Sequence, residues 1–203
     1  MKQALRPCRL PLVNQLVRML WRAVWILLYR PSPQMFHGWR RLLLRMFGAK
    51  MGRGTFAYPS VKIWAPWNLD MGDHSCLSHF VDCYCVDKVV LGRHATVSQY
   101  SHLCTASHDY NLHDMPLVTA PIMIKDHAWV TADVFVGPGV TIGQGAVVLA
   151  RSTVTRDVAS WVVAAGAPAK QVGVRDRREF VADMDDITKD NKAINNARDI
   201  STK

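Results

Sequence analysis

The sequence predicts an all-β solenoid, a coil of short parallel strands, because its aliphatic residues recur with an unusual period. From residue 124 to residue 159 an aliphatic residue appears every six positions without a slip, at Ile124, Val130, Val136, Ile142, Val148 and Val154. The fourth residue after each of these is small or β-branched, at Ala128, Val134, Val140, Ala146, Ser152 and Val158. A period of six suits neither an α-helix nor a hairpin sheet. It suits a triangular coil in which three strand-and-turn units point their aliphatic residues at the axis.

Glycine often follows the aliphatic position directly, as at Gly137 and Gly143, where we expect it to serve the turn between strands. The same six-residue register continues upstream through Leu91, Val97 and Leu103, with small residues at Ala95, Ser101 and Ser107 and a looser version at Met71 and Leu77.

One corner of the coil must release a loop. The step from Leu103 to Ile124 is 21 residues, which is not a multiple of six. The surplus is a loop of roughly 15 residues, DYNLHDMPLVTAPIM. Long ordered loops on rigid scaffolds usually carry function.

The chain before the coil reads as a helical extension. Residues 1–15 are basic and irregular, with Pro7 and Pro11 preventing a long helix. Residues 16–29 predict a helix of about 20 Å at 1.5 Å per residue. Arg18 and Arg22 interrupt it, and it is too short to span a bilayer, which needs about 20 apolar residues. A second amphipathic segment follows at residues 35–47.

The net charge of +9 belongs mainly to this extension, because the chain up to Arg53 holds eleven Lys and Arg and no Asp or Glu. That distribution disfavours nucleic acid as a partner of the solenoid. Two interpretations of the helices stay open. They cap the first coil or a neighbouring subunit, or residues 16–47 make peripheral contact with anionic lipid, for which Trp and Arg on short amphipathic helices are typical.

The five cysteines contain no CxxC pair and predict no disulfide framework, so we expect a reducing compartment. Cys83 and Cys85 are read as small apolar residues of the solenoid wall. No secretory signal is visible, and we expect a cytoplasmic protein with peripheral contact at the inner face of the membrane as the alternative.

Three segments are predicted: a basic helical extension at 1–58, a solenoid domain at 59–174, and a C-terminal helix and polar tail at 175–203. The solenoid starts irregularly within residues 50–70, where Val61 is a less regular member of the six-residue aliphatic repeat. End repeats of solenoids are often irregular. From Arg175 the chain is charged and predicts one short helix, and residues 187–203 read as a disordered tail.

Several motifs resemble the left-handed β-helix acyltransferases, in the branch of galactoside, maltose and xenobiotic acetyltransferases. They are SHDYN at 107–111, AW at 128–129, GPGVTIGQGAVV at 137–148 and VVAAGAPAKQV at 162–172. The stretch RPSPQMFHGWRRLLLRMFGAKMG at 30–52 is similar to colanic acid biosynthesis acetyltransferases. The resemblance covers most of residues 15–175. It implies a left-handed coil, where the general rule for parallel crossovers gives a right-handed one. It also implies a homotrimer with sites between subunits, acetyl-CoA as acyl donor, and no metal.

His108 is the predicted general base. It lies where the third unit of a coil ends and the loop leaves, so its imidazole can project from the wall. Acyl transfer to a hydroxyl needs a base for the hydroxyl proton, and neutral imidazole can take it near pH 7. The resemblance aligns the family's general-base histidine with His108. Its orienting partner stays open between Asp109, Asp82, Asp87 and a backbone carbonyl.

Asp82 and Asp87 are also candidates for binding the acceptor's hydroxyls, with Asp109 beside the base, or they are solvated turn carboxylates. The sequence departs here from the galactoside-type pattern, whose polar acceptor contacts fall on Ser78 and Val86. The acceptor is therefore left open.

Trp129 follows the loop and matches the family's tryptophan beside the pantetheine arm and the base, although an aromatic residue in a solenoid can also serve packing. The positions that match the family's cofactor contacts are Trp129, Ala132, Ala150, Thr155, Arg156 and Lys170. Coenzyme A is a long polyanion, which a groove between coils with basic side chains would suit. Ala132 and Ala150 are 18 residues apart, one full coil. Each basic residue alone could instead be a solvated surface charge.

The resemblance implies an acetyl-CoA-dependent O-acetyltransferase acting on a sugar hydroxyl in exopolysaccharide biosynthesis, by direct transfer with backbone amides stabilising the oxyanion. Cys104 lies too far inside the register to be a nucleophile. Two alternatives remain. One is a zinc hydro-lyase of the γ-carbonic-anhydrase type, with ligands drawn from His74, His79, His102, His108, His113 and His127. The other is a scaffold at the membrane without catalytic activity.

Overall fold

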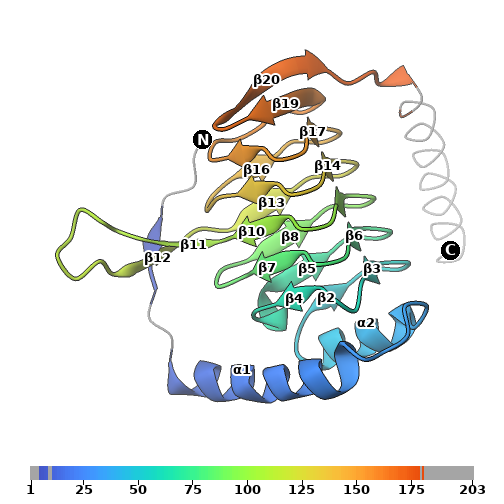
Figure 1. Ribbon diagram of the computed structural model, residues 1–203, viewed down its shortest axis with the longest axis vertical. Coiled ribbons are helices and arrows are strands. Elements are labelled where there is room, and N and C mark those ends of the chain that lie inside the picture. The colour runs from blue at the N-terminus through green and yellow to red at the C-terminus, as the bar shows by residue number, and fades with distance from the viewer. Residues whose placement is uncertain (1–4, 9–10, 179, 181–203) are drawn as a thin grey trace, which may run out of the picture.

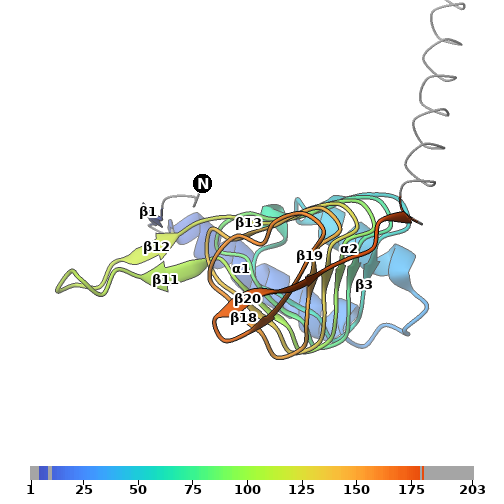
Figure 2. The same ribbon diagram turned by 90° about the horizontal axis from the view of Figure 1, so that it is seen from above.

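Three sheets wrap around one axis, because each coil of the chain contributes one short strand to each sheet (Figures 1 and 2). The computed structural model describes residues 5–8, 11–178 and 180. The chain forms a left-handed parallel β-helix, as predicted. We number the sheets in the order in which the chain visits them.

The first sheet contains β2 (Lys50–Met51), β5 (Leu69–Met71), β8 (Val89–Leu91), β13 (Ile122–Ile124) and β16 (Thr141–Ile142). The second contains β3 (Phe56–Ala57), β6 (Cys76–Leu77), β9 (Thr96–Val97), β14 (Trp129–Val130), β17 (Val147–Val148), β19 (Val162–Gly166) and β20 (Ala169–Val174). The third contains β4 (Lys62–Ile63), β7 (Asp82–Tyr84), β10 (His102–Cys104), β15 (Phe135–Val136) and β18 (Thr153–Val154). Only β20 runs antiparallel within these three sheets of the described chain, against β19, where it ends the coil.

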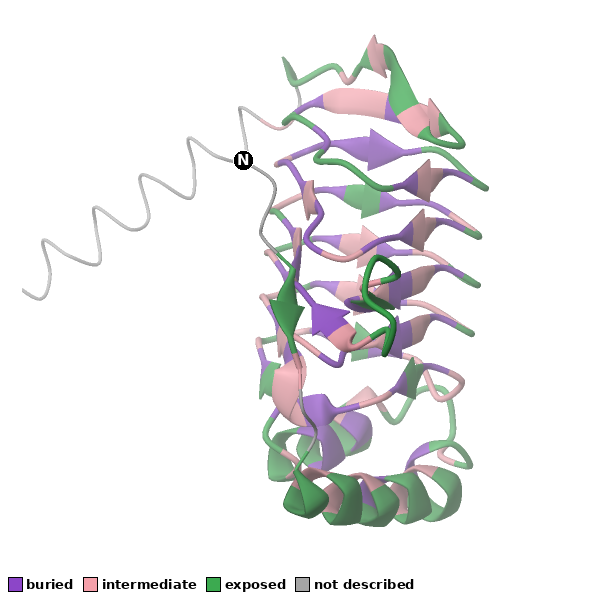
Figure 3. Cartoon of the chain, turned by 90° about the vertical axis from the view of Figure 1, so that its left-hand side faces the viewer, coloured by how far each residue is buried: buried purple, intermediate pink, exposed green. Residues whose placement is uncertain are grey.

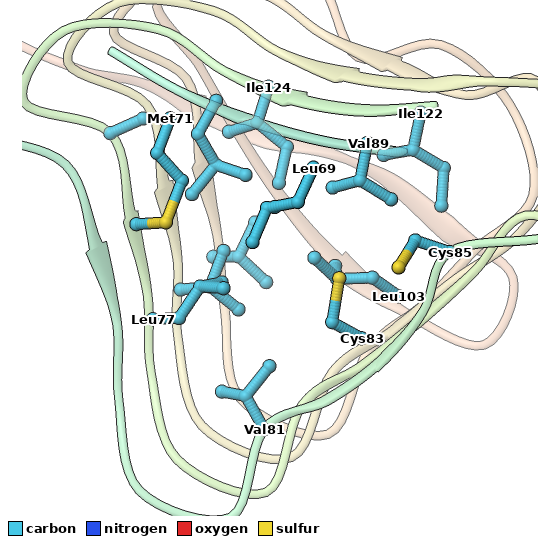
Figure 4. Close-up of a cluster of buried hydrophobic side chains, with 14 of the residues drawn as sticks. Leu69, Met71, Leu77, Val81, Cys83, Cys85, Val89, Leu103, Ile122 and Ile124 are labelled. Carbon is cyan, nitrogen blue, oxygen red and sulfur yellow. The ribbon is translucent and has the colours of Figure 1, made fainter. Parts of the chain in front are cut away.

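The aliphatic residues that recur every six positions form the core, as predicted. All six aliphatic positions between residues 124 and 154 are buried, and so are Leu91, Val97 and Leu103 upstream. Figure 4 shows Leu103 and Ile124 of this set, with Leu77 and other buried side chains, pointing into one narrow interior. Cys83 and Cys85 lie among them, which confirms their reading as apolar wall residues. All five cysteines are free thiols.

The prediction that the glycines directly after the aliphatic positions provide the turn conformation is wrong. Neither Gly137 nor Gly143 has a left-handed backbone, whereas Gly139 (φ 74°) and Gly145 (φ 64°) do. Gly143 is needed for a different reason: a Cβ atom there would lie 2.4 Å from the backbone nitrogen of Ser160 in the next coil. Close stacking of coils, not turn geometry, excludes a side chain at this position.

The N-terminal extension covers one end of the coil (Figure 1). Helix α1 (Leu12–Val24) continues into a π-helical turn, η1 (Trp25–Tyr29), and α2 (His37–Met46) follows, while η2 (Pro66–Asn68) is a short 3₁₀ turn inside the first coil. Helix α1 starts four residues before the predicted position, directly after Pro11. The indole nitrogens of Trp21 and Trp25 donate to the carbonyls of Ile63 (2.7 Å) and Val61 (2.8 Å) and so fix the helix to the third sheet.

Arg40 of α2 is completely buried and ties α2 to the coil. Its Nε donates to the carbonyl of Ala57 at 2.7 Å, and its two Nη atoms donate to the carbonyls of Pro33 and Gln34 and to the hydroxyl of Ser32. Nη2 also lies 2.9 Å from Nδ1 of His37. The charge is thus compensated by oriented carbonyl dipoles and not by a carboxylate.

The predicted loop is a hairpin that projects from the corner between the third and first sheets (Figures 2 and 3). It consists of β11 (Ala106–His108) and β12 (Leu117–Thr119), paired antiparallel, and it starts three residues earlier than predicted, so that Ser107 is exposed and leaves the buried register. The amide of Ala120 donates to the carbonyl of Thr105 at 3.0 Å and closes the base.

The N-terminal residues were expected to be irregular, but β1 (Arg6–Pro7) adds a third strand to this hairpin by pairing with β12. The free edge of β12 offers backbone groups that need partners, and a two-residue strand is too short to show a period in the sequence.

Two expectations fall partly or wholly outside the described residues: the C-terminal helix after Arg175, and the tail at 187–203. Over the part of the chain that the structure describes, no helix is both long enough and apolar enough to cross a bilayer.

Candidate active site

His108 ends β11 at the rim of the projecting hairpin, and its side chain is exposed. Its Nδ1 lies 2.6 Å from the carbonyl oxygen of Met115, across the hairpin. A carbonyl can only accept a hydrogen bond, so Nδ1 carries a proton, and in the neutral imidazole Nε2 is the nitrogen with the free lone pair. The imidazole is therefore oriented with its basic nitrogen available to a substrate proton.

Of the proposed orienting partners, the backbone carbonyl is the group that contacts the imidazole. The carboxylate of Asp109 instead accepts from the backbone nitrogen of Asn111 (3.1 Å) and from its side-chain amide (3.2 Å). These bonds fold the loop tip back on itself. Asp109 thus shapes the loop that presents His108.

Asp87 lies at the same corner as the hairpin, one coil earlier. Its backbone nitrogen donates to the hydroxyl of Thr105 at 2.9 Å, next to the base of the hairpin. Its Oδ1 accepts from the amide of Lys88 at 2.7 Å. Asp82 lies instead on the face of the third sheet, in register with Lys62 and His102.

A cavity of about 450 Å³ opens between α1 and the third sheet, and Asp82 lines it. The remaining lining residues are Arg18, Trp21, Arg22, Trp25, Lys62, Ile63, Trp64 and Tyr84. The guanidinium of Arg18 lies 4.1 Å from the centre of the Trp64 ring. Three cations and several aromatic rings face one carboxylate here, a composition that suits a polar, anionic or ring-shaped ligand.

Trp129 belongs to β14 of the second sheet, away from the corner that carries the hairpin. Its ring is 45% exposed, more than a packing role needs, and its Nε1 donates to the hydroxyl of Ser98 at 2.9 Å. The exposed indole is thus held in one orientation on the outer surface of the coil.

The candidate cofactor residues fall into separate groups. Ala132 and Ala150 occupy the same corner, between the second and third sheets, in successive coils, because the amide of Arg151 donates to the carbonyl of Ala132 at 3.0 Å. Thr155 and Arg156 are exposed at the corner that carries the hairpin, after β18. Lys170 is exposed on β20, opposite Ala165.

Within one chain the candidate residues therefore form two sets. His108, Asp109, Asp82, Asp87, Thr155 and Arg156 lie on the third sheet and the hairpin corner, whereas Trp129, Ala132 and Ala150 lie on the second sheet and its far corner.

Cys104 is half-buried at the end of β10, and its thiol donates to the carbonyl of Ala106 at 3.2 Å. Burial raises the pKa of this thiol, and the nearby Asp82 carboxylate raises it further. A protonated thiol is a poor nucleophile.

The histidines do not converge on one point. The rings of His74, His94 and His127 stack in a column along one corner, with centroids 5.0 Å and 5.1 Å apart. Among the residues that the structure describes, no group of three or more His, Cys, Asp or Glu side chains is arranged to hold a metal ion. The set needed for a zinc hydro-lyase therefore does not form within these residues of one chain.

Sequence reasoning missed Ser98, the partner of Trp129, and the role of β1 as the third strand of the hairpin. Met115 was reachable only as an unnamed backbone carbonyl. Its backbone is left-handed (φ 39°), which sequence does not reveal for a methionine.

A protein of Escherichia coli K12, with the provisional name colanic acid biosynthesis acetyltransferase WcaF, is 43% identical over 166 residues, which are 82% of this chain and 90% of that protein. The chain belongs to the acetyltransferases of this WcaF type. It is therefore an acetyltransferase. The galactoside O-acetyltransferase of the same organism is 29% identical, over 71% of this chain and 74% of that protein. No protein-family profile matches the sequence.

Solved structures agree with the fold. A hexapeptide-repeat acetyltransferase of Vibrio cholerae O1 biovar eltor, complexed with acetyl coenzyme A, superposes with a TM-score of 0.73 at 24% identity, covering 81% of this chain and 90% of that one. A galactoside acetyltransferase in complex with coenzyme A gives a TM-score of 0.74 at 23% identity, covering 82% and 84%. At these identities the likeness concerns the fold.

Proposed function

We propose that this WcaF-type protein transfers an acetyl group from acetyl-CoA to a hydroxyl of a sugar, in the biosynthesis of an exopolysaccharide of the colanic acid type. The observation that carries the proposal is the orientation of His108, whose Nδ1 is engaged by the Met115 carbonyl at 2.6 Å. In the neutral imidazole that bond would leave Nε2 free to act as a base, on an exposed hairpin beside a coil of the acetyltransferase fold.

The reaction is a direct transfer. Nε2 of His108 takes the proton of the acceptor hydroxyl as the oxygen attacks the thioester carbonyl. The tetrahedral oxyanion collapses, the C–S bond breaks, and the proton passes from the imidazolium to the departing thiolate, giving free coenzyme A and the acetyl ester. Backbone amides would stabilise the oxyanion. The raised pKa of Cys104 disfavours a covalent acetyl-enzyme through that thiol.

Acetyl-CoA as donor is supported by the relatives, one of which was solved with acetyl coenzyme A and another with coenzyme A. In this chain Trp129 would flank the pantetheine arm, and Ala132 and Ala150 would border the groove as small residues that admit it. Thr155 and the cations Arg156 and Lys170 would meet its polar groups and phosphates.

A site shared between subunits follows from the two sets of residues. His108 and Trp129 lie on different parts of one coil, so a neighbouring copy would bring its Trp129 set to the His108 set. This supports the expected homotrimer, in which each site would take residues from two chains.

The sugar acceptor rests on the names of the relatives, a colanic acid biosynthesis acetyltransferase and a galactoside O-acetyltransferase. Asp87 at the hairpin corner and Asp82 in the cavity beside α1 would accept hydrogen bonds from sugar hydroxyls.

The test is release of free thiol from acetyl-CoA by the wild-type protein with a panel of nucleotide-linked and lipid-linked sugars, with the product identified by its added acetyl group. Acceptor-dependent release that disappears in His108→Ala is the expected result. The control is His113→Ala, which removes an exposed histidine of the same loop, and the metal content of each preparation is measured in parallel.

Two results would contradict the proposal. Stoichiometric zinc without transfer to any sugar would favour a hydro-lyase, and full transfer by His108→Ala would remove His108 from the mechanism. A protein inert toward the whole panel would favour the scaffold interpretation.

A further inference from the structure

The end of the coil that the helices cover presents a large apolar surface to solvent, which we call the helical base. It is formed by exposed side chains of α1, η1, α2 and their connection: Leu12, Val13, Leu16, Met19, Leu20, Ile26, Leu27, Leu28, Met35, Phe36, Trp39, Leu42 and Met46. Contiguous exposed apolar surface of this extent marks an interaction site. We propose that the helical base docks on an anionic lipid surface.

Helix α1 is apolar on opposite sides. One side packs on the coil through Trp21, which is buried. The other carries Leu16 and Met19, and Leu27 continues it in η1, with exposures of 65%, 68% and 70%. An apolar face of a helix is stabilised when another surface covers it. The coil covers one side of α1 and leaves the other without a partner among the described residues.

The base is shaped for a surface. Figure 1 shows α1 lying across the end of the coil, at a steep angle to the coil axis, and Figure 3 shows that much of the helical surface at that end is exposed. A shallow apolar pocket of about 520 Å³ joins the end of η1 to the start of α2, lined by Leu27, Leu28, Pro31, Ser32, Pro33, Phe36 and Trp39. No described helix can span a bilayer, so contact would be interfacial, with the helices lying in the plane of the lipid surface.

Charge selects the occupant. The first 53 residues contain eleven Lys and Arg and no carboxylate side chain. Arg22 and Arg45 are exposed on these helices, and Arg30 is exposed directly after η1, while Arg22 also lines the cavity beside α1. Cations around an apolar face that has no acidic residue match a layer of anionic headgroups, each contributing about 1 kcal/mol near such a surface.

The same charge disfavours a second copy as the occupant. Two helical bases placed face to face would bring two sets of arginines together without a carboxylate to pair with them. Like charges across an interface oppose association.

Docking would also place the proposed active site near the lipid. Helix α1 contacts β4, and the hairpin leaves from β10, two strands further along the third sheet. At about 4.8 Å per strand β4 and β10 are roughly 10 Å apart, and the diameter of α1 adds about another 10 Å to the lipid surface. The docking proposal itself does not rest on the proposed reaction, because its test measures binding.

The experiment is flotation of the full chain with vesicles of neutral phosphatidylcholine, and with vesicles that also contain phosphatidylglycerol. We expect binding to the anionic vesicles that weakens with salt. The triple variant L16E/M19E/L27E should bind at least about tenfold less, because it removes apolar area and adds negative charge. R22E/R30E should weaken binding to anionic vesicles and abolish the difference between the two lipids.

The matched control is V172E/V174E, which alters two side chains of similar exposure (60% and 67%) on β20, at the opposite end of the coil (Figure 1). It should bind as the wild type does. Wild-type protein that stays unbound to anionic vesicles, or a triple variant that binds normally, would overturn the proposal. A lipid-free wild type that sediments as a larger assembly than the triple variant would assign the base to a second copy instead.

Discussion

The substitution Gly143→Ala should destabilise the protein, whereas Gly137→Ala should not. Both glycines directly follow an aliphatic residue of the six-residue repeat. At Gly143 the added Cβ would lie 2.4 Å from the nitrogen of Ser160 and 2.8 Å from its Cα. These are backbone atoms of the next coil, so relief requires the coil itself to move. At Gly137 the nearest atoms are 3.4 Å away, an ordinary contact.

The magnitudes follow from this geometry. Overpacking costs about 1–3 kcal/mol, and the upper end applies when backbone must move. For a protein of this size about 3 kcal/mol lowers the thermal midpoint by roughly 6–12 °C. Gly137→Ala gains up to about 1 kcal/mol by restricting the unfolded chain, so its midpoint should stay or rise slightly.

The assay is thermal unfolding followed by far-ultraviolet circular dichroism, with both variants and the wild type at one concentration. Equal midpoints for the two variants would refute the close-stacking argument. The consequence for function is local: Ser160 belongs to the coil that also carries Arg156, so Gly143→Ala should raise KM for acetyl-CoA as well.

Three further predictions concern the pH dependence of stability through His37, the hydrogen bond between Ser98 and Trp129, and the buried Arg40. Burial lowers the pKa of His37 from its ordinary 6.5, and the cations Arg40 and Arg41 lower it further. A depressed histidine contributes stability that is fully present above pH 6.5 and is lost as pH falls through the folded pKa. In urea titrations, His37→Gln should therefore weaken the acid loss of stability, and an unchanged pH profile would contradict this. Ser98→Ala removes the hydrogen bond to Trp129, worth about 1 kcal/mol. It should raise KM for acetyl-CoA about fivefold with kcat nearly unchanged. A lowered kcat with constant KM would argue against a role of Trp129 in binding acetyl-CoA. Arg40→Met should lower the free energy of unfolding by about 3 kcal/mol, while the exposed control Arg53→Met changes it by less than about 0.5 kcal/mol, and equal losses would refute the role of the buried guanidinium.

The coil could be predicted from sequence because its period is strict. Each aliphatic residue of the six-residue repeat from Ile124 to Val154 has the same environment, so six independent positions agree on one register. The helical extension could also be predicted, because an apolar run as long as residues 16–29 is longer than a strand of this coil and is typical of a helix. Its start was misplaced because Pro11 was taken to keep the preceding and following residues out of a helix. In fact α1 begins directly after Pro11, at Leu12.

The site could be predicted less completely, because its decisive contacts are not periodic. His108 was identifiable from its position at the end of a coil and from its motif. Its contact with the Met115 carbonyl depends on a hairpin and a left-handed backbone that no local pattern encodes. The pairing of β1 with β12 joins residues more than a hundred positions apart through two short strands, a signal too brief for sequence reading.

The most direct test of the account is turnover of acetyl-CoA by His108→Asn beside the wild type, with thermal unfolding of both. The asparagine amide can still donate to the carbonyl of Met115, so the hairpin should stay folded and the thermal midpoint should change little. It offers no basic nitrogen at the position of Nε2, so kcat should fall by roughly 100- to 10,000-fold. A variant that keeps its fold and more than about a tenth of wild-type kcat would contradict general-base catalysis by His108.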